Sequence, residues 1–199
     1  ISERTNGVVT VNVYPNNTFG DPNSWVDATN ADAPIISVAS FPAWDDKYPE
    51  ADALQAGFVW ESPEEIIRFY DTDLCKKIIA DLDEQNIHSL NAPIAAGMRH
   101  VIGRAAYSTP EAIKGLKLRT VNGKAWLECF QAMGASPMGM ASSEQLSALS
   151  AGTIDALDQS INLIYSTKSY ELVKDVTLLA QQPLWDAMFC STKWWNSLP

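Results

Sequence analysis

Residues 108–133 read STPEAIKGLKLRTVNGKAWLECFQAM, and this stretch decides the fold. Two hydroxyl residues before Pro110 predict the start of a short helix, because a hydroxyl can cap the first amides and proline fits the first turn. That helix is expected to end near Gly115. Residues 116–121 alternate between apolar and polar types, as a strand does, and 124–133 carry a helical apolar face. Helix, strand and helix in succession predict an α/β fold.

Similar signals continue on both sides of this stretch. Serine before proline at residues 62–63 predicts a long helix, and a capping box at residues 142–145 predicts another. The alternation of strands with capped helices favours a largely parallel sheet, in which ligands bind at the carboxyl ends of the strands. One short apolar run, residues 34–40, is a candidate parallel core strand. The other expected strands are 9–13, 87–90, 98–101, 116–121 and one beginning near 154.

The composition excludes several classes of protein. With 199 residues, 46% of them hydrophobic, the chain can bury a sizeable core in one domain or two. The formal net charge of −10 repels nucleic-acid phosphates and anionic membrane surfaces, so no nucleic-acid partner is expected. No apolar run approaches the roughly 20 residues of a membrane-spanning helix, so we expect no membrane insertion.

The sequence offers no catalytic or metal-binding motif. His88 and His100 are its two histidines, and neither lies in a metal-ligand pair or beside a nucleophile motif. The acidic clusters lack the spacing of a calcium loop, and no glycine-rich phosphate loop occurs. The three cysteines are widely separated and are expected to be buried thiols or, for one pair, a disulfide. We therefore expect no enzyme activity, no cofactor and no metal.

Two arginines and two tryptophans remain open to more than one interpretation. Arg119 is expected near the carboxyl end of a strand, where its guanidinium could hold a carboxylate through two parallel hydrogen bonds. An internal salt bridge is the alternative, both for Arg119 and for Arg99, which has a similar context. Trp60 and Trp185 could each line a pocket or simply belong to the core.

The segment from 108 to 119 resembles the "(T)PEDLKGLKIR" segment of the substrate-binding proteins of TRAP transporters, the DctP-like family. Further similar segments follow in the family's order and extend the resemblance over essentially the whole chain. They are residues 1–7, 11–16, 97–100, 133–137, 151–155 and 164–166.

This resemblance implies a periplasmic protein with two lobes that close around a small organic acid and deliver it to the TRAP membrane subunits. Arg119 resembles the family's carboxylate-clamping arginine, and Arg99 resembles a second basic residue at the pocket. Asp21 and Ser40 fall where loops of the first lobe approach the ligand in relatives. We also take Trp60 as a candidate wall of the substrate-binding site.

The chain departs from the family pattern at two candidate ligand residues. Gln159 stands where relatives commonly carry an asparagine, and it can still donate and accept hydrogen bonds. Ser142 stands where many relatives have an aromatic residue, which would remove a stacking wall and admit a bulkier or more polar solute. The first lobe is expected to contain residues 1–96 together with 185–199, and the second lobe residues 97–184.

Relatives also carry a strand and helix before the position of Ile1 and long helices after that of Pro199. The expected two-lobed fold is therefore incomplete, and unpaired strand edges could favour a dimer. Two alternatives to solute delivery stay open at this point. The chain could be a ligand-sensing domain of a signalling receptor, or an α/β enzyme that acts on an organic acid, although the missing catalytic motifs count against an enzyme.

Overall fold

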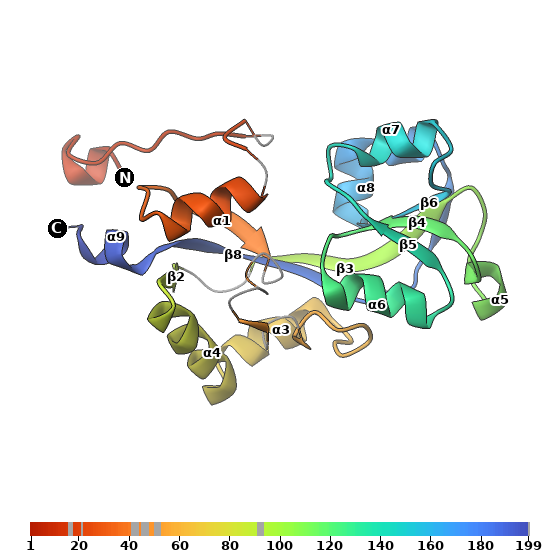
Figure 1. Cartoon of the computed structure of the whole chain (residues 1–199), viewed down its shortest axis with the longest axis horizontal. Helices are drawn as coiled ribbons and strands as arrows, with labels where there is room; N and C mark the ends of the chain where they lie inside the picture. The colour runs from red at the N-terminus through yellow and green to blue at the C-terminus, as the bar shows by residue number, and fades with distance from the viewer. Residues whose placement is uncertain are drawn as a thin grey trace.

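The computed structural model describes residues 1–15, 18–20, 22–40, 44, 48–49, 53–90 and 94–198. Figure 1 shows two groups of elements joined by two long strands, β3 (Ile94–Gly103) and β8 (Pro183–Ser191), with both chain ends in the same group. The first lobe also contains η1 (Glu3–Thr5), α1 (Pro22–Asn30), β1 (Ser37–Ser40), α3 (Pro63–Tyr70), α4 (Asp73–Glu84), β2 (Ile87–Ser89) and α9 (Thr192–Asn196). The second contains α5 (Pro110–Ile113), β4 (Lys117–Thr120), α6 (Lys124–Ala132), β5 (Ser136–Gly139), α7 (Gln145–Ser150), β6 (Ala156–Ser160), α8 (Ile161–Thr167), η3 (Ser169–Glu171) and β7 (Asp175–Thr177).

The strands form one mixed sheet in the order β1-β8-β3-β6-β4-β5, with β2 added to β8 and β7 added to β3. Among the described strands, β4 pairs in parallel with β5 and β6, whereas the pairs made by β3 and β8 are antiparallel. The α/β class and the two lobes are confirmed, but the expectation of mostly parallel sheets is wrong. Among the described strands, the adjacent pairs β4–β5 and β4–β6 are parallel, and the helices α6 and α7 provide the crossover connections that such pairing requires, whereas β3 and β8 run antiparallel to each of their neighbours.

The stretch that decided the fold forms the predicted elements. The Thr109 hydroxyl accepts a hydrogen bond from the Ala112 amide at 3.3 Å, and Pro110 opens α5. Gly115 has a φ of +72°, a left-handed conformation that suits glycine. The chain then enters β4, in which Leu118 is fully buried, and α6 follows with Trp126 buried. Local capping and periodicity therefore predict the centre of the second lobe correctly.

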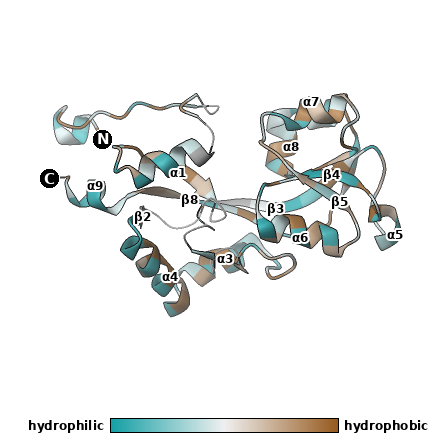
Figure 2. Cartoon of the chain, viewed as in Figure 1, coloured by the Kyte–Doolittle hydropathy of each residue, from teal (hydrophilic) through white to brown (hydrophobic). Residues whose placement is uncertain are grey.

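The predicted helix after residue 62 is present as two helices. Pro63 opens α3 as expected, and a second helix, α4, begins after Thr72, whose hydroxyl accepts from the Cys75 amide at 3.3 Å. Ile66 on α3 and Leu82 on α4 are fully buried against β8 and β2. Figure 2 shows hydrophobic and hydrophilic residues interleaved along α4, as expected for a helix with one packed face.

Three apolar clusters build the core. The first-lobe cluster includes Trp44, Trp185 and Phe189, with the Trp44 and Phe189 rings 5.5 Å apart in an edge-on arrangement. Two further clusters lie in the second lobe on opposite faces of its strands, one around Leu118 and Phe130 and the other around Leu157, Leu149 and Ile164. Each lobe therefore has a core of its own, as a two-lobed fold requires.

Three local expectations need correction. Residues 9–13 form no strand among the described residues, and Val11 and Val13 are exposed, because alternation alone supplies no hydrogen-bonding partner. The run 34–40 does contain β1, but β1 is antiparallel to β8. The capping box at 142–145 does not form. Instead, the side-chain Nε2 of Gln145 donates to the Ser142 hydroxyl at 3.0 Å, and α7 begins at Gln145.

Candidate functional site

A buried ion pair lies where β3, β4 and β6 of the second lobe meet. Arg99 on β3 is 1% exposed, and its Nε donates to both carboxylate oxygens of Asp158 on β6 at 3.0 Å. Its Nη2 donates to the Asp158 carbonyl, and its guanidinium lies 5.0 Å from the centre of the Trp126 ring. The internal salt bridge that the sequence left open therefore exists for Arg99.

Asp158 is the centre of this network, and the sequence analysis missed it as a site residue. It is fully buried and also accepts hydrogen bonds from the Thr120 hydroxyl at 2.8 Å and from Gln181 Nε2 at 2.7 Å. A carboxylate can remain ionised in the interior when a cation and several donors surround it. The available signal was an acidic residue inside an otherwise buried strand, because such a residue requires a buried partner.

Arg119 differs from Arg99 in its partners. It is 4% exposed, and its Nε and Nη2 both donate to one neutral group, the carbonyl of Met140, at 3.1 and 2.8 Å. Within the described part of the chain, it forms no ion pair with a carboxylate. Burial lowers the pKa of Arg119 to about 10, with the nearby positive charge of Arg99 adding to the effect and Asp158 opposing it. The group is still a cation at neutral pH, and its charge is incompletely compensated.

Arg99 and Arg119 lie at one end of the second-lobe sheet, and the alternation of side chains along each strand decides from which face each one projects. Thr120 on β4 and Asp158 on β6 point to the same face, whereas Arg119 lies opposite Leu157, which packs on the other face. Arg119 lies near the carboxyl end of β4, and Arg99 lies opposite Ser160 at the carboxyl end of β6, so the positive charge of Arg99 is near enough to help lower the pKa of Arg119. The arrangement is two cations near one carboxylate at the carboxyl ends of β4 and β6, with Asp158 paired to Arg99 and not to Arg119.

The other sequence-predicted residues have different surroundings. The amide of buried Gln159 is engaged inside the second lobe, because its oxygen accepts from the Ser169 hydroxyl at 2.7 Å and its nitrogen donates to Thr167 at 3.5 Å. Ser142 is exposed in the loop before α7. Their predicted roles toward a ligand remain predictions.

The first-lobe candidates are more widely spread. Ser40 is the last residue of β1 and lies opposite Asp186 of β8. Trp60 packs edge-on against Phe69 and Trp185, with ring centroids 5.2 and 6.3 Å away, and its indole nitrogen donates to the Leu54 carbonyl at 2.6 Å. Trp60 and Trp185 thus belong to the core side of the lobe. Asp21 lies outside the described residues.

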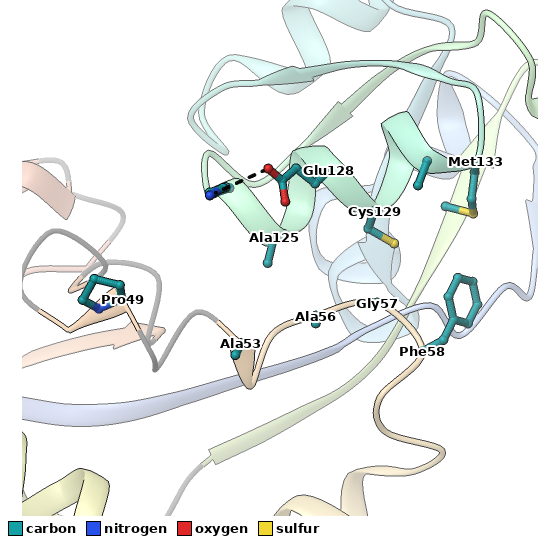
Figure 3. A pocket seen from close by; sticks show the side chains of 11 residues that line it. Pro49, Ala53, Ala56, Gly57, Phe58, Ala125, Glu128, Cys129 and Met133 are labelled. Carbon is teal, nitrogen blue, oxygen red and sulfur yellow. Dashed lines mark ion pairs between the residues drawn. The ribbon is translucent and has the colours of Figure 1, made fainter.

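A pocket of about 610 Å³ separates residues 53–58 from α6. Figure 3 shows Ala53 and Phe58 on one side of the pocket and Cys129 on the other. Lys124 and Glu128, one turn apart on this helix, form an ion pair at 3.9 Å. Neither Arg99 nor Arg119 lines this pocket. Its size alone does not make it the anion site, because its described lining residues are mostly apolar and the cation among them, Lys124, is paired with Glu128.

The described residues contain no group of three or more His, Cys, Asp or Glu side chains arranged to hold a metal ion. In the same part of the chain, no helix is both long and apolar enough to cross a bilayer. Cys75, Cys129 and Cys190 are free thiols, and burial raises the pKa of each to about 11. The disulfide that the sequence left open is therefore not formed.

The polar network on β3, β4 and β6 is located in a chain that matches one family model throughout. The model of the bacterial extracellular solute-binding proteins, family 7, called DctP, covers residues 1–199. The chain belongs to the DctP family. This match confirms the resemblance found in the sequence. Members of this family are solute-binding proteins and not enzymes.

Solved structures and curated proteins agree with membership of the DctP family. A TRAP periplasmic solute-binding protein from Desulfovibrio salexigens, in complex with diglycerolphosphate, is 30% identical, with a TM-score of 0.95 over 100% of this chain and 64% of that one. One from Actinobacillus succinogenes with bound L-galactonate is 25% identical, with a TM-score of 0.92 over 100% and 66%. The Escherichia coli 2,3-diketo-L-gulonate-binding periplasmic protein YiaO is 26% identical over 89% of this chain and 54% of YiaO.

The chain thus spans roughly half to two thirds of the length of these relatives. The fold and the family are common to all of them, and the bound solutes differ from one relative to the next. The DctP family therefore fixes the kind of protein, while the solute of this chain has to be argued from its own residues.

One testable consequence concerns His100, which adjoins the network on β3. Its Nδ1 accepts from the Ala180 amide at 3.1 Å, and burial lowers its pKa below the ordinary 6.5, with Asp158 opposing and Arg99 adding to this shift. Below pH 6.5 the unfolded chain therefore binds more protons at this site than the folded chain, so the free energy of unfolding falls as pH decreases toward the folded pKa.

We expect His100→Asn to flatten this pH dependence, because an asparagine oxygen can accept the same amide without titrating. Urea unfolding between pH 6.5 and pH 5 measures it, with His88→Asn as the matched control, since His88 bonds Asp83 at the far end of the first lobe. An unchanged slope in His100→Asn would contradict the assignment.

Proposed function

We propose that this chain captures a small organic anion between its lobes, with Arg119 holding the acid group, and delivers it to the membrane subunits of a TRAP transporter. The observation that carries the proposal is the environment of Arg119, a buried cation whose hydrogen bonds to the described residues go to a neutral carbonyl, that of Met140. A buried charge without an opposite charge is unfavourable, and an anionic solute would supply one.

The charges of the network support a monoanionic head group. Arg99 and Arg119 contribute two positive charges and Asp158 one negative charge, so the three side chains leave one positive charge in excess. A planar guanidinium can bind a carboxylate or a phosphate through two parallel hydrogen bonds. Arg119 would have to leave part of its contact with Met140 to do so, or use its remaining donors.

Arg99 has a different role in this proposal. Because Asp158 already occupies its Nε and Nη2, we assign Arg99 to positioning the network and to the positive field at the site. Ser142, Ser40, Gln159 and Asp21 are kept as candidate solute contacts, and Trp60 as a support beneath the first-lobe surface.

Closure of the lobes would occur about the strands that both lobes share. We propose the boundaries 1–96 with 185–199 for the first lobe and 97–184 for the second. The pairing of β3 with β8 is irregular between Ala95 and Met98, and Gly97 there has a φ of +92°. A bulge and a left-handed glycine interrupt the regular ladder at the boundary, which favours bending at this point.

Membership of the DctP family supports a proposal for the compartment and the partners. Its members are periplasmic solute-binding proteins, as the names of YiaO and of the DctP proteins say. We therefore propose a periplasmic location for this chain and a TRAP transporter as its partner. Dimer formation is not part of the proposal.

Isothermal titration calorimetry of the purified chain tests the proposed function. The probes are L-galactonate, D-glucuronate, L-malate, succinate and sn-glycerol 3-phosphate, with D-galactose and glycerol as uncharged controls. We expect saturable binding of at least one anion and none of the uncharged compounds. Equal binding of an anion and its uncharged counterpart, or no binding of any anion, would refute the proposal.

A further inference from the structure

The carboxylate of Asp186, on a strand that connects the lobes, has no partner among the residues that the structure describes. Asp186 of β8 is flanked by Ser40 on β1 and by Ile94 on β3 in antiparallel register. Residues directly opposite each other in such pairs project from the same face of the sheet. Asp186 and Ser40 therefore share one face, whereas Trp185 and Ala187 project from the other face into the first-lobe core.

Asp186 is half-buried, yet its carboxylate makes no hydrogen bond or ion pair with any residue in the described ranges. Burial raises its pKa, and the positive charge of Arg99 acts in the opposite direction, which places Asp186 within the field of the arginine network. Arg99 itself is committed to Asp158 through its Nε and Nη2. Half-buried carboxylates usually have a partner, so this one is available to a group that arrives with the solute.

The chemistry of the site favours a hydroxyl as that group. A hydroxyl can donate to an ionised carboxylate and can also accept from a protonated one, so it suits Asp186 in either state. An ammonium group would require the ionised form, which burial disfavours. A metal ion would need further ligands, and the described residues contain no cluster that could supply them.

We propose that Asp186 selects hydroxylated anions, by hydrogen-bonding a hydroxyl of the solute whose acid group Arg119 holds. This inference rests on the proposed function and adds the part of the solute that the first lobe would recognise. Ser40, directly opposite Asp186, is placed to contact the same region of the solute.

Two matched pairs of probes test the selection by calorimetry on the full chain. L-malate and succinate differ by one hydroxyl, and L-galactonate and hexanoate share a six-carbon carboxylate skeleton with and without hydroxyls. We expect the wild type to favour the hydroxylated member of a pair, and Asp186→Ala to reduce that preference by about tenfold or more, as loss of a hydrogen bond to a charged group predicts. Affinity for the unhydroxylated member should change little.

Two variants control for indirect effects. Asp186→Asn retains a hydrogen-bonding group of the same shape and should recover part of the preference, while Asp175→Ala removes an exposed carboxylate from β7 and should leave it intact. An unchanged preference in Asp186→Ala, or stronger binding of L-aspartate than of L-malate to the wild type, would overturn the inference and leave the proposed function standing. If the wild type binds no anion, both fall.

Discussion

Replacing Arg119 with alanine is expected to weaken binding of the anionic solute by about 2–5 kcal/mol, because the variant removes one partner of a charge pair that is desolvated when the lobes close. Arg119 forms no ion pair with a described carboxylate, so its removal takes no buried charge partner away from the folded protein. The variant should therefore remain folded. Calorimetry with the tightest-binding anion, together with urea unfolding, separates the loss of binding from a loss of structure.

Two further variants sharpen this prediction. Arg119→Lys keeps the charge but cannot reproduce the planar fork, so it should recover only a small part of the lost affinity. Arg68→Ala removes an arginine side chain that is 70% exposed on α3 and should bind like the wild type. Full recovery by Arg119→Lys would mean that the charge alone matters, and unchanged affinity in a folded Arg119→Ala variant would eliminate the clamp.

The second large effect concerns stability. Asp158→Asn should lower the free energy of unfolding by about 3–5 kcal/mol, because it leaves the buried Arg99 without its counter-charge. Thr120 and Gln181 each donate to one of the two oxygens of Asp158, so the NH2 group of the new asparagine would also face a hydrogen-bond donor instead of an acceptor. Urea unfolding at neutral pH measures the change.

The control for Asp158 is Asp155, an exposed carboxylate just before the same strand. Asp155 is 43% exposed and lies 3.9 Å from Arg104, so Asp155→Asn should change the free energy of unfolding by less than about 1 kcal/mol. The double variant Arg99→Met with Asp158→Asn should lose about 1–3 kcal/mol less than the sum of the single variants, because the two side chains interact directly. Additive losses would show that the pair is not energetically coupled.

Local signals in the sequence were sufficient for the centre of the second lobe. These signals are short-range features that each act within a few residues. They are the cap and proline at Thr109–Pro110, the positive φ at Gly115 and the alternation in β4. Pairing direction is a long-range property. β3 and β8 run through both lobes and pair antiparallel with β1, β6 and β7, which no local pattern reveals. For this reason the expected parallel sheet became a mixed one.

The candidate site was predictable only where short-range signals in the sequence mark its residues. Arg119 could be singled out because a cation at the end of an apolar strand is unusual in itself. Asp158 offered only the weaker signal of an acidic residue in an apolar strand, and its role depends on Arg99, which lies 59 residues away in the sequence and beside it across the β3–β6 pairing. Gln159, next to Asp158, projects from the opposite face of β6 and is engaged by Ser169 and Thr167.

A crystal structure of the chain with its tightest-binding anion tests the central claim most directly. We expect the acid group of the solute to lie between the lobes within about 2.7–2.9 Å of two guanidinium nitrogens of Arg119, as a charge-assisted bidentate contact requires. A structure in which Arg119 is still bonded to the Met140 carbonyl alone, or is paired with an acidic side chain of the protein, while the solute occupies another place, would contradict it.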